Sequence, residues 1–150
     1  MLPGKNIRLN FKPPSKGIGM STPTKKIVVV EDEPDTAEMF AEMMRLSGYE
    51  VLKCYGGTTA IALITQEKPD AIVMDLMMPD LSGMEVIRHL RQNPRLSTIP
   101  IIVVSAKGLP SDIKQGLDAG AMVYLTKPVS YIDLKEAVEH AVKNYRKDAA

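Results

Sequence analysis

The chain has 150 residues, of which 45% are hydrophobic and 25% charged, and 19 Lys and Arg against 18 Asp and Glu leave a net charge of +1. This composition is typical of one globular domain, which at this length buries an ordinary apolar core without disulfides. The near-neutral charge and the absence of Trp disfavour a nucleic-acid binder.

The sequence also indicates where the protein acts. No apolar run approaches the ~20 residues of a membrane span, and the N-terminus has no continuous apolar core like that of a signal peptide. Cys54 is the only cysteine, so an internal disulfide is excluded. We therefore expect a cytoplasmic protein that does not contact a membrane.

The N-terminal segment differs from the rest of the chain. Residues 1–19 hold four basic residues and no acidic one, and prolines and glycines are frequent. We interpret residues 1–24 as a flexible basic leader, residues 25–147 as the folded domain and residues 148–150 as a tail. Two interpretations of the leader stay open. It is either an electrostatic tether to an acidic partner or a disordered extension that precedes a natural start at Met20.

Short apolar runs predict five strands, beginning with a continuous β-branched run after Lys25. Such runs are typical of parallel strands buried on both faces. The second run is shorter and more polar, which suits the edge of a sheet. The five expected strands are residues 26–31, 50–55, 70–75, 99–104 and 121–125.

Segments with helical periodicity follow each run. Ser82 and Glu85 form a capping-box pattern, and Gly48 and Gly120 are stop signals. The expected helices are 36–47, 59–68, 82–93, 110–118 and a last one from about residue 130, which would bury Leu134, Val138, Ala141 and Tyr145.

This alternation predicts a doubly wound α/β fold, with a five-stranded parallel sheet and five helices on its two faces. Ligands of such sheets bind at the carboxyl ends of the strands, where the strand order reverses. Three carboxylates, a hydroxyl and an ammonium leave the strands at that edge: Glu31, Asp32, Asp75, Ser105 and Lys127.

Three carboxylates close together repel one another and favour a bound cation. Oxygen ligands at an open site suit Mg²⁺. Zinc is disfavoured, because His89 and His140 fall within helices and Cys54 is alone.

These residue types suit phosphoryl transfer. The carboxylate of Asp75 is a competent nucleophile toward phosphorus, and a metal held by Glu31 and Asp32 would neutralise charge on the phosphoryl oxygens. Lys127 would bind another of those oxygens, and the Ser105 hydroxyl would donate to a third.

From about residue 25 to 145 the sequence resembles the receiver domain of two-component response regulators. The resemblance rests on residues 30–33 (VEDE), 74–79 (MDLMMP) with Gly83, 104–106 (VSA) and 124–128 (YLTKP). It implies a flavodoxin-like sheet with strand order 2-1-3-4-5.

The resemblance also implies a role for each site residue. Asp75 would be the phosphoacceptor, Glu31 and Asp32 the metal-site acids, the Met77 backbone carbonyl a further metal ligand, Ser105 the switching hydroxyl, Lys127 the phosphoryl-binding lysine and Tyr124 the rotating aromatic. The Lys127–Pro128 bond would be cis. Glu31 and Ser105 depart from the commoner Asp and Thr.

On this resemblance the protein is a stand-alone, phosphorylation-dependent switch without an output domain. It would take a phosphoryl group from a histidine kinase or a histidine phosphotransfer protein and act on an unidentified protein target. It would not be an enzyme beyond its own phosphorylation and dephosphorylation. A homodimer through the fourth and fifth helices is left open. The apolar Met77 predicts slow loss of the phosphoryl group, because it cannot orient water.

The same residues also admit other interpretations. Taken singly, Glu31 or Asp32 is compatible with a helix cap, and Asp75 or Ser105 with a turn. A phosphatase of the haloacid dehalogenase type would need a second Asp where Met77 stands. A flavin-binding module is disfavoured by the acids of residues 31–35, which would repel its phosphate. A receiver-like interaction module that works without phosphorylation remains the alternative.

Overall fold

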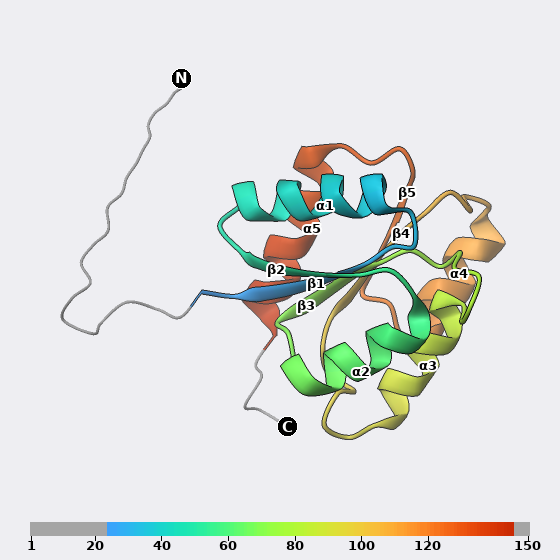
Figure 1. The fold of residues 1–150 in the computed structure, drawn as a ribbon. Coiled ribbons are helices and arrows are strands. Elements are labelled where there is room, and N and C mark those ends of the chain that lie inside the picture. The colour runs from blue at the N-terminus through green and yellow to red at the C-terminus, as the bar shows by residue number, and fades with distance from the viewer. Residues whose placement is uncertain (1–23, 146–150) are drawn as a thin grey trace.

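The computed structural model describes residues 24–145 and shows five strands and five helices in strict alternation (Figure 1). The strands are β1 (Lys26–Val30), β2 (Glu50–Cys54), β3 (Ala71–Met74), β4 (Ile101–Ser105) and β5 (Val123–Thr126). The helices are α1 (Pro34–Leu46), α2 (Gly57–Glu67), α3 (Gly83–Gln92), α4 (Pro110–Ala119) and α5 (Tyr131–Asn144).

The sheet confirms the predicted fold class and strand order. All pairings are parallel, in the order β2-β1-β3-β4-β5. Helices α1 and α5 lie on one face and α2 and α3 on the other (Figure 1). The polar second strand is an edge strand, as its sequence indicated.

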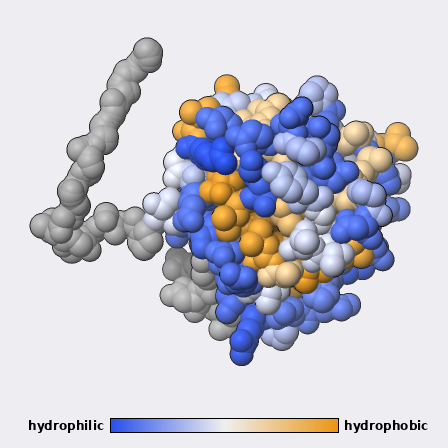
Figure 2. Space-filling view, viewed as in Figure 1, coloured by the Kyte–Doolittle hydropathy of each residue, from blue (hydrophilic) through white to orange (hydrophobic). Residues whose placement is uncertain are grey.

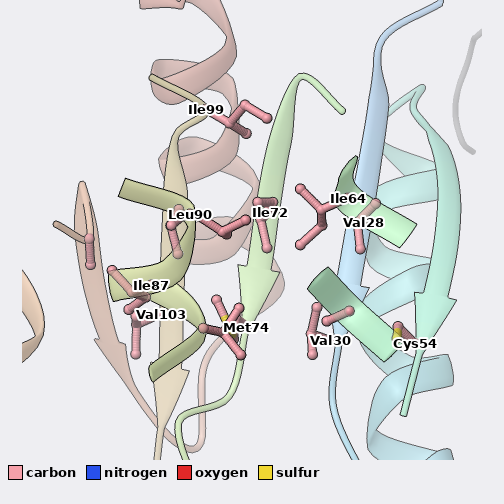
Figure 3. Close-up of a cluster of buried hydrophobic side chains, with 14 of the residues drawn as sticks. Val28, Val30, Cys54, Ile64, Ile72, Met74, Ile87, Leu90, Ile99 and Val103 are labelled. Carbon is pink, nitrogen blue, oxygen red and sulfur yellow. The ribbon is translucent and has the colours of Figure 1, made fainter. Parts of the chain in front are cut away.

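Alternate residues of the strands enter two separate cores, because successive side chains point to opposite faces. Val28 and Val30 join the cluster under α2 and α3 (Figure 3), whereas Ile27 and Val29 pack under α1 and α5. All four are fully buried. Each such side chain stabilises the fold by roughly 1.5–3 kcal/mol, which explains the unbroken apolar run in the sequence.

Element boundaries differ from the predicted ones by about two residues. α1 begins at Pro34, because Glu33 acts as the N-cap, and α2 begins at Gly57. β4 begins at Ile101 and β5 at Val123. The predicted leader, apart from Thr24, and the predicted tail at 148–150 lie outside the described residues.

The prediction for Tyr145 was wrong. α5 buries Leu134, Val138 and Ala141 in the cluster it shares with α1, but the helix ends at Asn144. Tyr145 is the extended C-cap residue, half-buried, and it packs against the other cluster. Helical spacing therefore does not apply to it.

Among residues 24–145, none of the helices combines the length and the apolar character that a membrane crossing requires.

Candidate functional site

The predicted site residues come together at the carboxyl edge of the sheet. β1 lies between β2 and β3, so the chain leaves β1 toward one side and returns to the other. The Asp75 backbone N–H donates to the Val30 carbonyl at 3.0 Å, which places the end of β3 beside the end of β1. This is the point of strand-order reversal at which ligands bind in such sheets.

Lys127 bridges the two buried acids. Its Nζ lies 2.9 Å from Glu31 Oε1 and 2.9 Å from Asp75 Oδ2. Glu31 and Asp75 are buried, whereas the Lys127 side chain keeps 27% of its surface exposed. The single positive charge of the ammonium thus partly compensates two negative charges that burial would otherwise penalise.

Burial shapes the charges of this pair. It raises the pKa of Glu31 above its usual value, against the hydrogen bonds donated by Lys127 and the Glu33 backbone. Burial also acts to lower the pKa of Lys127, but the bonds to Asp75 and Glu31 outweigh it and the pKa is raised. Burial therefore disfavours the ionised form of Glu31, and a further cation nearby would stabilise that form.

The three acids are arranged as a metal site requires. Glu31, Asp32 and Asp75 each offer a carboxylate oxygen, and these atoms lie within 4.8 Å of one another. Asp32 is half-buried, whereas Glu31 and Asp75 are buried. All the side-chain donors are oxygen atoms, which suits a hard divalent ion.

The open question of helix capping is answered by a residue that sequence reasoning missed. Glu33, not Glu31 or Asp32, is the N-cap of α1, and its Oε1 accepts from Thr36 N at 2.7 Å. Glu33 N in turn donates to Glu31 Oε2 at 3.2 Å. The acidic pair is therefore left for the site, while the third acid begins the helix.

Ser105 and Tyr124 are connected through the backbone of one residue, Lys107. Its N–H donates to Ser105 Oγ at 3.1 Å, and its carbonyl accepts from the Tyr124 hydroxyl at 2.7 Å. The turn predicted as an alternative for Ser105 is thus present. Gly116 lies against the Tyr124 ring, since an added Cβ would come within 2.7 Å of a ring carbon.

The loop that follows Asp75 is held at three places. Met77 N donates to Asp75 Oδ1 at 3.0 Å, so the aspartate also makes the turn considered for it. Gly83 N donates to the Leu76 carbonyl, and a Cβ at Gly83 would lie 2.6 Å from the Asp75 carbonyl, a distance that requires glycine.

The Lys127–Pro128 peptide is cis, as the resemblance implied.

Asp80 is the third attachment, and no sequence signal pointed to it. Its carboxylate accepts from Gly57 N at 3.1 Å and Thr58 N at 3.0 Å, at the N-terminus of α2. These backbone bonds lower its pKa to about 2. The partners lie 22 and 23 positions away, so only the folded chain brings them together.

Replacing Asp80 by Asn should lower the midpoint of thermal unfolding at pH 7, because the amide cannot accept both backbone bonds as a carboxylate does. The carboxylate has a depressed pKa in the folded state, so its contribution is present above the ordinary pKa and is lost as the pH falls toward about 2. Melting curves of the two proteins should therefore converge between pH 4 and pH 2. Equal unfolding midpoints at pH 7 would show that the hydrogen bonds of the Asp80 carboxylate do not stabilise the fold.

Asp32→Asn should weaken Mg²⁺ binding by about tenfold or more, because attraction between a divalent ion and one carboxylate at 4 Å exceeds ~1.4 kcal/mol even in water. Without metal the variant should be more stable by up to about 1 kcal/mol, because repulsion among the three acids is reduced. Calorimetric titration and urea unfolding in EDTA measure the two effects. A less stable metal-free variant would contradict the repulsion argument.

Comparison with known proteins agrees with this geometry. The family model described as response regulator receiver domain matches residues 27–139. Protein PilH of Pseudomonas aeruginosa is 39% identical over 104 residues, which are 69% of this chain and 86% of PilH. The phosphate regulon transcriptional regulatory protein PhoB of the same organism is 42% identical over 106 residues, which are 71% of this chain but only 46% of PhoB.

A solved structure is also similar to this chain. The receiver domain of a Pseudomonas aeruginosa sensor histidine kinase was solved with a magnesium ion coordinated in its active site cleft. It is 30% identical, superposes with a TM-score of 0.76, and the match covers 81% of this chain and all of that one.

Proposed function

This chain belongs to the response regulator receiver domain family, and from that premise we propose that it is a phosphorylation-dependent switch whose phosphoacceptor is Asp75. The observation that carries the proposal is the double contact of Lys127. One ammonium, open to solvent on one side, lies 2.9 Å from both Asp75 and the metal-site acid Glu31. Asp32 supports the proposal, because it offers a third carboxylate oxygen within 4.8 Å of those of Glu31 and Asp75, as a hard divalent ion would require.

In the proposed reaction, a carboxylate oxygen of Asp75 attacks the phosphorus of a phosphohistidine on a partner protein. The new O–P bond forms an acyl phosphate, the N–P bond breaks, and the released imidazole takes a proton from solvent. Met77 N holds Asp75 Oδ1, so the carboxylate is oriented before the donor arrives. Lys127 then binds the phosphoryl oxygens as a point charge.

The residues present fit a Mg²⁺ ion. Glu31, Asp32 and Asp75 would hold it, together with the Met77 carbonyl that the family resemblance implies. When bound, the ion would neutralise charge on the transferring phosphoryl group. The magnesium found in the related kinase receiver supports this assignment.

The signal would leave the site through Ser105. A phosphoryl group on Asp75 would draw the Ser105 hydroxyl away from Lys107 N, and the same residue's carbonyl holds Tyr124. Tyr124 would then turn and remodel the surface formed by α4, β5 and α5. α4 is suited to move, since Gly116 is its only buried residue.

The partners follow from this function. We infer a histidine kinase or a histidine phosphotransfer protein as donor and a protein as target, all in the cytoplasm. The near-neutral charge gives no support for direct nucleic-acid binding. A homodimer through α4 and α5 remains a prediction.

The test is the intact mass of the protein after incubation with Mg²⁺ and phosphoramidate. We expect a single phosphoryl adduct that EDTA prevents. If neither a small donor nor a histidine kinase produces an adduct, the phosphorylation-independent interaction module becomes the better description.

Met77 should make the phosphorylated state long-lived. Its side chain is 52% exposed beside Asp75 and has no group that can orient water toward phosphorus. We expect a half-life longer than about a minute, and a several-fold shorter one for Met77→Asn, which can bind a water molecule. Loss of the adduct over time, followed by mass spectrometry, measures both. Faster decay in the natural protein than in the variant would contradict the argument.

A further inference from the structure

The ammonium of Lys127 has a third neighbour besides the two acids. It lies over the ring of Phe40, 6.0 Å from the ring centre. A cation at this distance from an aromatic face is attracted by the negative charge density of the ring. This contact is separate from the hydrogen bonds that Lys127 donates to Glu31 and Asp75. Two different kinds of interaction therefore hold the ammonium in the site.

Phe40 is a rigid support for this contact. It lies in the second turn of α1 and is only 2% exposed, in the cluster that also contains Val29 and Leu134. Figure 2 shows apolar side chains that reach the surface over β2, between α1 and α2, whereas the ring of Phe40 is enclosed by the core. Close packing fixes a buried ring in one position. The ring therefore stays in place when the polar groups of the site change partners.

The cluster around Phe40 does not by itself call for an aromatic side chain. Its other buried members, among the residues that the structure describes, are aliphatic or methionine. An aliphatic side chain would also bury apolar surface, but it has no negatively charged face to offer to a cation. The aromatic residue is found at the position that Lys127 covers.

The contact gains importance when the acids bind something else. Glu31 and Asp75 would share their oxygens between Lys127 and a divalent ion, and the two cations repel each other. The lysine side chain is flexible and 27% exposed, so its ammonium could then move toward solvent. The Phe40 ring is not a ligand of the ion, and its attraction for the ammonium persists.

We propose that Phe40 is a positioning residue for phosphoryl transfer, whose ring keeps the Lys127 ammonium beside Asp75 while the acids hold a cation. This inference rests on the proposed function, because it explains how Lys127 stays available to the phosphoryl oxygens. Phe40 does not touch the phosphoryl group and acts only through the ammonium. A purely structural role would depend on the size of the ring, whereas the positioning role depends on the charge of its face.

Fluorination of the ring separates these two roles, because fluorine withdraws charge from the aromatic face and changes the ring volume little. In the full chain, Phe40 is replaced in turn by phenylalanine with one, two or three ring fluorines. The rate of adduct formation with Mg²⁺ and phosphoramidate is followed by intact mass. We expect the rate to fall with each added fluorine, by about two- to fivefold over the series.

Urea unfolding in EDTA provides a second readout that requires neither metal nor phosphoryl transfer. The unfolding midpoint of the natural chain should fall with each added fluorine, because the ring attracts the ammonium less strongly. Lys127→Leu is the matched control, since it leaves an apolar side chain at this position and removes the charge. In this background neither the midpoint nor the residual rate should follow the number of fluorines.

Equal rates across the series in the natural chain would overturn the positioning role, even if Lys127→Leu proves too unstable to measure. The same stepwise fall in Lys127→Leu would also overturn it, because the effect would then come from packing. If the chain with natural Phe40 forms no adduct, the proposed function fails and the positioning role fails with it. A midpoint that still follows the number of fluorines would then assign the contact to stability alone.

Discussion

Asp75→Asn is expected to reduce the phosphoryl adduct from a measurable plateau to below detection while the fold is kept. An amide oxygen is a poor nucleophile toward phosphorus, and an amide nitrogen whose lone pair is delocalised is no better. The substitution preserves shape, so Met77 N can still donate to the side-chain oxygen that it contacts at 3.0 Å. Intact mass after Mg²⁺ and phosphoramidate measures the loss, and circular dichroism checks the fold.

Asp118→Asn is the matched control. Asp118 is exposed on α4, and Lys114 is its only partner among the contacts described for it. Its adduct should equal that of the natural protein. An adduct that persists in Asp75→Asn would show that another group accepts the phosphoryl group, and the assignment of Asp75 would be wrong.

Lys127→Ala is expected to have the largest effect on stability. The substitution leaves Glu31 and Asp75 buried and without their shared cation. Removing one partner of a buried pair costs 3–5 kcal/mol, and we expect about 3 kcal/mol, because Lys127 itself is partly exposed. Urea unfolding in EDTA measures the loss, and Mg²⁺ should restore part of it.

The pH dependence of that loss has a definite sign. Burial already raises the pKa of Glu31, and without the ammonium the pKa rises further. A carboxyl whose pKa is raised on folding is destabilising when ionised, so the deficit of the variant should shrink as the pH is lowered and the acid is protonated. A deficit that grows on acidification would refute the account.

The same variant tests the switch. Lys127→Ala should still accept some phosphoryl group on Asp75 but should not transmit the change, because the ammonium no longer orients the phosphoryl oxygens toward Ser105. The NMR environment of Tyr124 should then stay as in the unphosphorylated protein. Lys114→Ala, which removes an exposed pair on α4, should leave both stability and switching unchanged.

The order of apolar runs and helical segments was sufficient to predict the fold class, because continuous β-branched runs form buried parallel strands and such strands require crossover helices. The same patterns also placed Glu31, Asp32, Asp75 and Lys127 at the carboxyl edge of the sheet, where the structure brings them together. Helical periodicity predicted the wrong environment for Tyr145. The helix ends before this residue, and its ring packs against the other hydrophobic cluster.

What the sequence by itself determined was therefore which side chains reach the ligand-binding edge, because that follows from local patterns and the topology they impose. The tertiary structure alone decided which atoms meet there. Lys127 bridges acids that lie 52 and 96 positions away, Asp80 joins two elements by capping α2, and the backbone of Lys107 connects Ser105 to Tyr124. These contacts depend on the packing of segments that are distant in sequence, and no local pattern records such packing.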